Sequence, residues 1–267
     1  MKNLSNYILE AKTKIQHIDI RQPKSRSELE MIISGAFKRK QYDLNFIDTS
    51  KITDMSELFE GVKHNFDVSS WDVSNVKDMS KMFSRCYAFT GKGLKNWDVS
   101  NVTDMSHMFD SCSIFIGKGL ENWDVSNVTN MYSMFLHCKK FDCDLSNWDM
   151  SNVIDTSLMF SNCAKFTGKG IENWNVSKVK SMYAMFGDCT NFNCDVSNWD
   201  VSNVTDMDSM FVNCKKFTGK GLENWNVSKV KTMRTMFNGC KFNYHELDWD
   251  LSGLSSQLKT FRNYLDD

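Results

Sequence analysis

The sequence has little proline, no excess of charge of either sign and no long apolar run. Its 267 residues include one proline, Pro23, and carry a formal net charge of −1. A nucleic-acid-binding surface usually makes a chain strongly basic, so this balance favours neither nucleic acid nor an anionic membrane as a partner. Because no stretch of about 18 apolar residues occurs, we expect no membrane insertion.

A secretory signal is also lacking. The first 15 residues contain no apolar core and no small-residue cleavage site, and Glu10 stands where the core should be. We therefore expect a cytoplasmic protein, or one carried in a virion, and a cell-surface location is not favoured. Leu4, Ile8, Ala11 and Ile15 would share one face of a helix, which predicts an amphipathic lead-in.

What the sequence does contain is one repeat, copied along most of its length. All eight tryptophans occupy the same position in it, at successive spacings of 26, 26, 25, 26, 25, 26 and 24 residues. They are Trp71, Trp97, Trp123, Trp148, Trp174, Trp199, Trp225 and Trp249. A fixed period in the twenties predicts a tandem array in which each repeat packs only on its neighbours.

The apolar residues of a repeat predict its secondary structure when they are counted from the tryptophan as position 0. They recur at −3, 0, +2 and +5, and the alternating part predicts a strand. A second set recurs at +8, +11, +12 and +15, which is the spacing of one helix face. We therefore predict an α/β solenoid of about nine rungs, a leucine-rich-repeat-like right-handed coil. One face would be a parallel β-sheet, and short helices would cover the other.

The repeats do not reach either end of the chain. A helix is predicted over residues 25–40, which Ser25 or Ser27 can cap and which would cover the first rung. The predicted segments are an N-terminal lead-in at 1–24, a capping helix at 25–42, the repeat solenoid at 43–248 and a degenerate C-terminal capping repeat at 249–267.

The repeat core W-D-V-S-N-V-T-D-M-S-x-M-F-x-x-C resembles the BspA-like leucine-rich-repeat surface proteins and the repeats first described in mycoplasma lipoproteins. The resemblance covers about residues 43–261, and the lead-in from Lys24 to Phe59 is similar to versions common in gut Bacteroidales and their phages. It implies a curved solenoid used in adhesion or protein binding, with no known catalytic residues. The chain departs from exported members because it lacks a secretory signal.

A second resemblance gives an alternative function. The stretch from Met1 to Ala11 is similar to the amphipathic head-targeting leaders of T-even-like phage internal proteins. This resemblance implies a phage virion or head-associated structural protein. An accidental amphipathic start explains the same residues, and the sequence does not separate the two interpretations.

Seven of the nine cysteines occupy one repeat position, where they would stack as small buried groups. They are Cys86, Cys112, Cys138, Cys163, Cys189, Cys214 and Cys240. Adjacent rungs, about 4.8 Å apart, lie within disulfide range, so geometry alone does not exclude bonds. The missing secretory signal favours free thiols. The other two, Cys143 and Cys194, would lie two rungs apart, roughly 9.6 Å, which is too far for a bond without distortion.

No catalytic, cofactor or metal site is predicted. The Gly-Lys-Gly triplets around Lys92, Lys118, Lys169 and Lys220 lack the spacing of a phosphate-binding P-loop and are explained by wide turns. No two of the five histidines share a metal-ligand spacing. Because nearly every polar residue recurs in each rung, no unique acid, base or nucleophile converges, and we expect no enzyme.

The outward positions of the predicted strands give a candidate binding face. Position −1 forms an asparagine row: Asn96, Asn122, Asn147, Asn173 and Asn198. Position +1 forms an aspartate row: Asp72, Asp98, Asp124, Asp149 and Asp200. A solvated ladder that keeps the sheet soluble explains both rows. The functional interpretation is an extended face for a host or virion protein with basic or amide groups. Calcium along the aspartates is a weaker alternative, and end-to-end self-association stays open.

Overall fold

The computed structural model describes residues 20–252 and residue 254. The amphipathic face predicted near the N-terminus and most of the predicted C-terminal cap lie outside these residues. In the described part the helices are α2 (Arg26–Lys38) and three short 3-10 helices, η1 (Leu94–Asn96), η2 (Leu222–Asn224) and η3 (Tyr244–Glu246). Extended strands are absent from this part, and neighbouring repeats instead form isolated parallel β-bridges.

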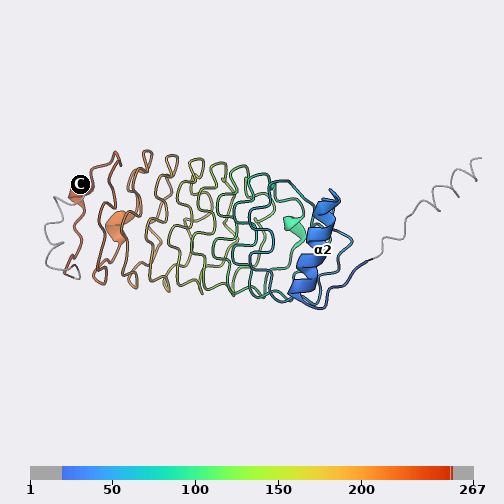
Figure 1. Ribbon diagram of the computed structural model, residues 1–267. Helices are drawn as coiled ribbons and strands as arrows, with labels where there is room; N and C mark the ends of the chain where they lie inside the picture. Colours follow the sequence, from blue (N-terminus) through green and yellow to red (C-terminus); the bar gives the residue numbers. More distant parts are fainter. Residues whose placement is uncertain (1–19, 253, 255–267) are drawn as a thin grey trace, which may run out of the picture.

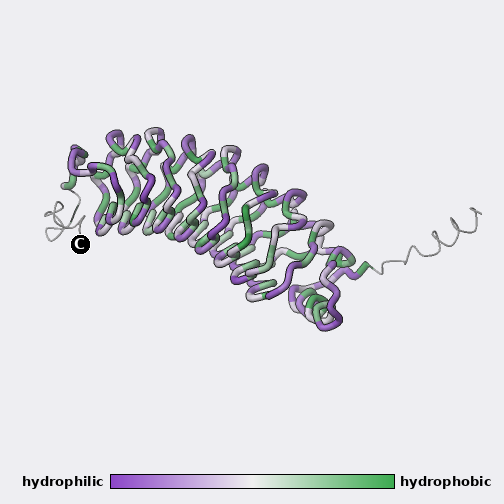
Figure 2. The backbone as a smooth tube through the Cα atoms, turned by 90° about the horizontal axis from the view of Figure 1, so that it is seen from above, coloured by the Kyte–Doolittle hydropathy of each residue, from purple (hydrophilic) through white to green (hydrophobic). Residues whose placement is uncertain are grey.

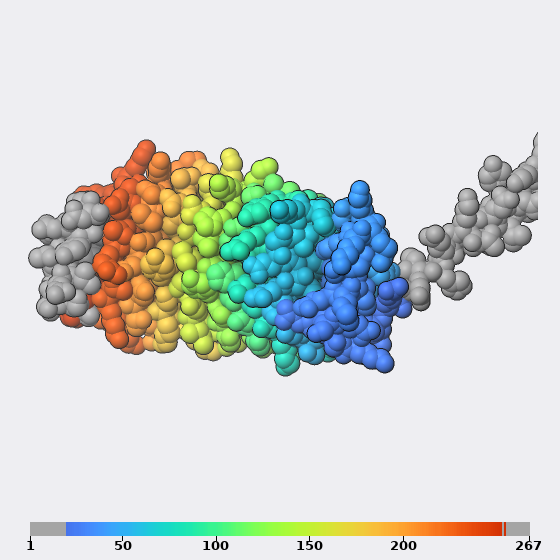
Figure 3. Space-filling view, in the orientation of Figure 1, coloured from blue at the N-terminus to red at the C-terminus, as the bar shows by residue number. Residues whose placement is uncertain are grey.

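The repeats lie side by side as coils, in the order of the sequence. A coil here means one repeat, counted from its tryptophan. Figure 1 shows the coils in one row, from α2 at the blue end to the red C-terminal end, and Figure 2 shows that the row is bent. In the space-filling view the colours form successive bands, so each coil contacts the coils before and after it (Figure 3).

Helix α2 covers the N-terminal end of the row (Figure 1). Its N-cap, Ser25, accepts a hydrogen bond from the backbone N–H of Glu28, which satisfies one of the unpaired donors at a helix start. Leu29, Ile33 and Ala36 on its inner face are buried. The helix predicted over residues 25–40 is therefore present, and it shields the apolar end of the first coil from water.

The core consists of stacks, each supplied by one repeat position. The tryptophans from Trp71 to Trp225 are only 2–5% exposed. The phenylalanines at position +12 form an unbroken ring stack from Phe59 to Phe237, with centroids 5.4–5.9 Å apart. Full burial of such a ring is worth roughly 1.5–3 kcal/mol, more than the ~1 kcal/mol of a hydrogen bond, so the rings dominate stability. The core positions predicted from the repeat are confirmed.

The short helices predicted at positions +8 to +15 are wrong for the described coils. Each segment is a run of turns whose alternate N–H groups bond the next coil. From Met105 to Ser111 these alternate groups donate to carbonyl oxygens between Asn130 and Leu136 over 2.7–3.1 Å. The strand predicted around each tryptophan is also wrong, because the described coils contain no extended strand and seven of the nine isolated parallel bridges join residues at position +7.

Backbone conformation at positions +10 and +14 explains why no helix forms. In one coil, His107 has φ 55° and Ser111 has φ 62°, and every other described coil repeats this pattern. A right-handed helix requires negative φ at each residue. Each such non-glycine residue costs roughly 1–2 kcal/mol, which the bonds to the next coil offset. The turns still bring positions +8, +11, +12 and +15 to the core, so the apolar spacing fits both structures.

Two rows of side-chain donors hold each coil to the one before it. The indole N–H of all eight tryptophans donates to the carbonyl oxygen at position −3 of the preceding coil over 2.9–3.3 Å. The seven thiols of the cysteine position donate to the carbonyl oxygen at +12 over 2.9–3.1 Å. These carbonyls also accept a backbone N–H of their own coil: the Leu120 oxygen bonds both Trp123 and Trp148.

Replacing Trp148 with phenylalanine tests the indole bond. The variant loses the 2.9 Å bond to Leu120 and part of the buried ring, so the free energy of unfolding should fall by roughly 1–3 kcal/mol. Urea denaturation followed by circular dichroism measures the change. Tyr87→Phe, at an exposed ring, should shift stability by less than about 0.5 kcal/mol. Equal stability of W148F and wild type would show that the indole N–H has no structural role.

Candidate functional site

The asparagine row and the aspartate row both lie on the surface of the coils. All ten candidate residues are exposed, on either side of a buried tryptophan. Four of the aspartates belong to consecutive coils, from Asp72 to Asp149, before Asn175 takes the equivalent place in the next coil. The structure therefore brings four acidic side chains into one uninterrupted series.

The aspartate row has a structural role that the sequence analysis missed. One carboxylate oxygen of each aspartate accepts the backbone N–H of the serine two residues later, over 2.9–3.0 Å. Asn175 and Asn226 make the same bond with their amide oxygens, at 3.1 Å. This Asx turn replaces a backbone bond where the chain changes direction. The Asp-x-Ser spacing of the repeat was the available signal.

The same turn favours the charged form of the aspartates. Hydrogen bonds from Ser126 hold the pKa of Asp124 below its usual value, and those from Ser202 lower the pKa of Asp200. A carboxylate that accepts hydrogen bonds in the folded state is stabilised relative to its protonated form. These two side chains consequently stay negative at neutral pH.

The asparagine row is used in part for contacts between coils. The Asn147 amide donates to the Asn122 side-chain oxygen at 3.3 Å and to the Glu121 carbonyl oxygen at 3.1 Å. Asn198 donates to the Asn173 side chain at 3.1 Å. Two pairs of the row are therefore bonded across neighbouring coils.

A third polar row, at position +4, was not identified from the sequence. Its amide groups donate to the carbonyl oxygen of a serine in the preceding coil over 2.7–2.9 Å. The donors are Asn75, Asn101, Asn127, Asn152 and Asn203. In two coils Lys178 and Lys229 stand there and bond the asparagine side chain of the preceding coil at 2.7 and 2.9 Å. Asparagine or lysine recurs at position +4 because its side chain bonds the preceding coil.

The Gly-Lys-Gly turns carry ion pairs between coils. Lys169 contacts Asp144 at 3.0 Å, and Lys220 contacts Asp195 at 2.8 Å. The pair lowers the pKa of Asp195 to about 2, mainly through the hydrogen bond from Lys220. All eight glycines of the triplets have positive φ, which fits the wide turns expected there.

The cysteines are poorly suited to nucleophilic chemistry. All nine are free thiols, and all except Cys240 are buried, so the predicted free thiols are confirmed. Burial raises the pKa of Cys143 and of Cys194 to about 12. Because the thiolate is the reactive form, these side chains stay unreactive at neutral pH.

The structure brings two histidines of neighbouring coils to one carboxylate. Nδ1 of His107 and of His137 lie 3.8 and 3.7 Å from the Asp110 carboxylate oxygens. Burial by itself would raise the pKa of Asp110, but hydrogen bonds from His107 and Ser111 outweigh it and lower the pKa. No group of three or more metal-ligating side chains with the required geometry occurs within the described residues.

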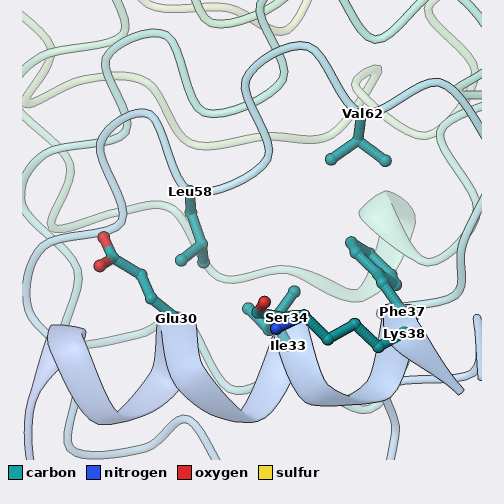
Figure 4. A pocket seen from close by; sticks show the side chains of 7 residues that line it. All are labelled: Glu30, Ile33, Ser34, Phe37, Lys38, Leu58 and Val62. Carbon is teal, nitrogen blue, oxygen red and sulfur yellow. The ribbon is translucent and has the colours of Figure 1, made fainter.

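An apolar hollow lies between α2 and the first coil. Figure 4 shows Ile33 and Phe37 of α2 near Leu58 and Val62 of the coil, with Lys38 at the edge. A ligand site normally adds a few convergent polar groups to apolar walls. The polar groups of this hollow belong to side chains at its rim and do not converge on its interior. The hollow is explained by the packing of α2 on the first coil, and its lining residues indicate no chemical function.

Comparison with known proteins identifies a family. The sequence matches the family described as "Mycoplasma protein of unknown function, DUF285" in three overlapping stretches, residues 27–115, 88–170 and 159–265. A search of curated proteins gives no match. Among the described residues, no helix combines the length and apolar character needed to span a bilayer.

Acidification tests the charged Asx turns. The folded-state pKa values of Asp124 and Asp200 lie below their unfolded values, so the folded form binds fewer protons. Their stabilising contribution is present above about pH 4 and is lost as the pH falls through the folded-state pKa. Between about pH 5 and pH 2, the urea midpoint of D124N/D200N should fall less steeply than that of wild type.

The matched alanine variant separates charge from turn geometry. At neutral pH D124N/D200N should unfold close to wild type, because asparagine accepts the same bond at Asn175 and Asn226. D124A/D200A should lose about 0.5–2 kcal/mol per site, as capping side chains do. Identical midpoints for the asparagine and alanine variants would contradict the role assigned to the oxygen.

Proposed function

We propose that this chain, which belongs to the family described as "Mycoplasma protein of unknown function, DUF285", is a non-enzymatic solenoid scaffold that binds another protein. The three tandem family matches span residues 27–265, so the repeats make up nearly all of the chain. Repeat arrays present long surfaces whose chemistry recurs from one unit to the next, which suits extended partners.

The observation that supports the proposal is the second carboxylate oxygen of each aspartate in the row, which the Asx turn does not use. One oxygen of every carboxylate in the aspartate row closes the Asx turn. Within the described residues the other oxygen has neither an ion pair nor a hydrogen bond to protein. Four such oxygens, from Asp72 to Asp149, follow one another on consecutive coils. A partner with basic or amide groups at a matching spacing would pair with them.

Lack of convergence supports a binding role over catalysis. An active site needs a distinct acid, base or nucleophile placed around one reacting atom. The polar side chains of the described coils instead recur at fixed positions, and most bond the neighbouring coil or their own turn. The buried thiols have pKa values too high for a thiolate nucleophile.

The phage alternative and the location remain predictions. The resemblance to head-targeting leaders rests on residues 1–11, which lie outside the described part of the chain. A virion role, a cytoplasmic location and end-to-end association between copies are each compatible with a binding scaffold. The partner's chemistry is therefore the property to test first.

A triple substitution in the aspartate row tests the proposed face. D98N/D124N/D149N removes three charges while leaving an oxygen to close each turn, as Asn175 does. The full-length chain is used to capture proteins from cell lysate at about 0.15 M salt, and retained proteins are quantified by mass spectrometry. Binding of the proteins held by wild type should weaken about 3- to 150-fold with the variant, since three exposed pairs at roughly 0.2–1 kcal/mol each contribute about 0.6–3 kcal/mol.

The control removes three charges from another repeat position. D78N/D155N/D206N changes half-buried aspartates at position +7, where Asn130 occurs naturally and accepts a backbone N–H at 3.0 Å. This variant should retain the captured proteins. Equal capture by wild type and D98N/D124N/D149N would rule out the aspartate row as the binding face.

A further inference from the structure

One pair of neighbouring coils breaks the alternation of long and short return turns. A long turn runs from the phenylalanine at the end of one coil through Gly-Lys-Gly to the next tryptophan, as in residues 217–225. In the C-terminal half each long turn follows a short one. The long turns at residues 89–97 and 115–123 instead follow each other directly.

This order leaves one lysine without its acidic partner. In three long turns the central lysine contacts an aspartate of the preceding short turn, four residues before the tryptophan; Lys92 contacts Asp67 at 2.5 Å. The turn that precedes Lys118 is long and places Gly93 at the aspartate's position. Lys118 forms no ion pair with a carboxylate within the described residues.

A substitution in the first long turn adds a second uncompensated charge. The other three long turns have glutamate two residues after the second glycine, and Glu121 accepts the backbone N–H of Gly119 at 2.7 Å. In the first turn this residue is Lys95. Consequently the N–H of Gly93 has no carboxylate acceptor, and no described residue accepts its hydrogen bond in place of the missing glutamate.

These groups line one hollow on the surface. The cavity has a volume of about 380 Å³, and its walls include Lys92, Lys95 and Lys118 together with Ser69, Thr90 and Asn96. None of its lining residues is acidic. Lys92 is balanced by Asp67, which leaves Lys95 and Lys118 as the lining charges without a carboxylate partner. The Glu121 carboxylate lies beside the wall, where it bonds the N–H of Gly119. We call this cavity the lysine hollow.

We propose that the lysine hollow binds the phosphate group of a small soluble phosphomonoester. A phosphate carries a charge of about −1.5 to −2 and three acceptor oxygens, which matches the two unpaired ammonium groups together with the Asn96 amide and the Gly93 N–H. The hydroxyls of Ser69 and Thr90 already donate to Asp67 and Asn65. A carboxylate has one charge and would leave half of the positive charge unbalanced. The cavity volume is at the lower end of the range for ligand pockets, which fits a phosphate on a small organic group.

The backbone of the two turns positions these donors. A Cβ atom on Gly93 would lie 2.6 Å from the Ser69 backbone, and one on Gly119 would lie 2.9 Å from the Lys95 nitrogen. Only glycine allows this approach, because real Cβ atoms essentially never come within 3.0 Å of such atoms. The close contact brings Lys95 and Lys118 to one cavity although they belong to successive turns.

Isothermal titration of the full-length chain with glycerol 3-phosphate, inorganic phosphate and acetate tests the proposal. At constant ionic strength, both phosphates should bind saturably with one site per chain, and acetate should bind at least about tenfold more weakly. K95E restores the glutamate of the other turns and should weaken phosphate binding at least about tenfold. K118Q, which removes one charge, should weaken it several-fold.

The matched control is K169Q, at a long turn whose lysine already has Asp144 as partner. It should bind both phosphates as wild type does. Circular dichroism and the urea midpoint verify that each variant is folded. If K95E does not fold, K118Q still tests the proposal. The proposal is overturned by absence of saturable binding up to about 10 mM, by equal binding of acetate, or by equal losses in K169Q and K118Q.

Discussion

Each coil is held in register by a side-chain hydrogen-bond donor that bonds the preceding coil. The indole N–H of every tryptophan meets a carbonyl oxygen that its own coil's backbone already uses once. A carbonyl oxygen has two lone pairs, and here the second is directed to the neighbouring repeat. Indole and thiol bonds therefore fix the register, while the stacked rings supply most of the buried area. A slip by one residue would break both ladders and turn the rings out of their stacks.

The fixed register also explains how the strained turns persist. Non-glycine residues with positive φ occur at positions +10 and +14 of successive coils, and each is unfavourable in an isolated peptide. In the array, these conformations point alternate N–H groups at the next coil, where carbonyl oxygens accept them. Strain within a coil and bonding between coils are thus two aspects of one backbone arrangement. A single isolated repeat lacks the bonds to a neighbouring coil, so we do not expect it to adopt this conformation.

Side-chain burial could be predicted from the sequence, but backbone conformation could not. The period of the tryptophans and the spacing of Met105, Met108, Phe109 and Cys112 identified the core, because burial leaves a direct record in residue type. The same spacing fits a helix and a series of turns, since both bring those four residues to one side. Nothing in Lys81 or His107 as residue types indicates positive φ. The exposure of the aspartate row was likewise predictable. Its use in Asx turns was not predicted, although Ser74 and its equivalents stand two residues after each aspartate.

The same reasoning separates constancy from function. Position +4 asparagines are among the most regular polar residues of the repeat, and they hold neighbouring coils together. The chemistry with the best claim to specificity lies where regularity fails, at two successive long turns. Every junction between coils also has the same polarity: the C-terminal side of one coil packs on the N-terminal side of the next, so no two-fold axis relates neighbouring coils. Unequal recombination can therefore lengthen or shorten the protein by whole repeats without requiring a new kind of contact, as the similar double repeats at residues 148–198 and 199–248 indicate.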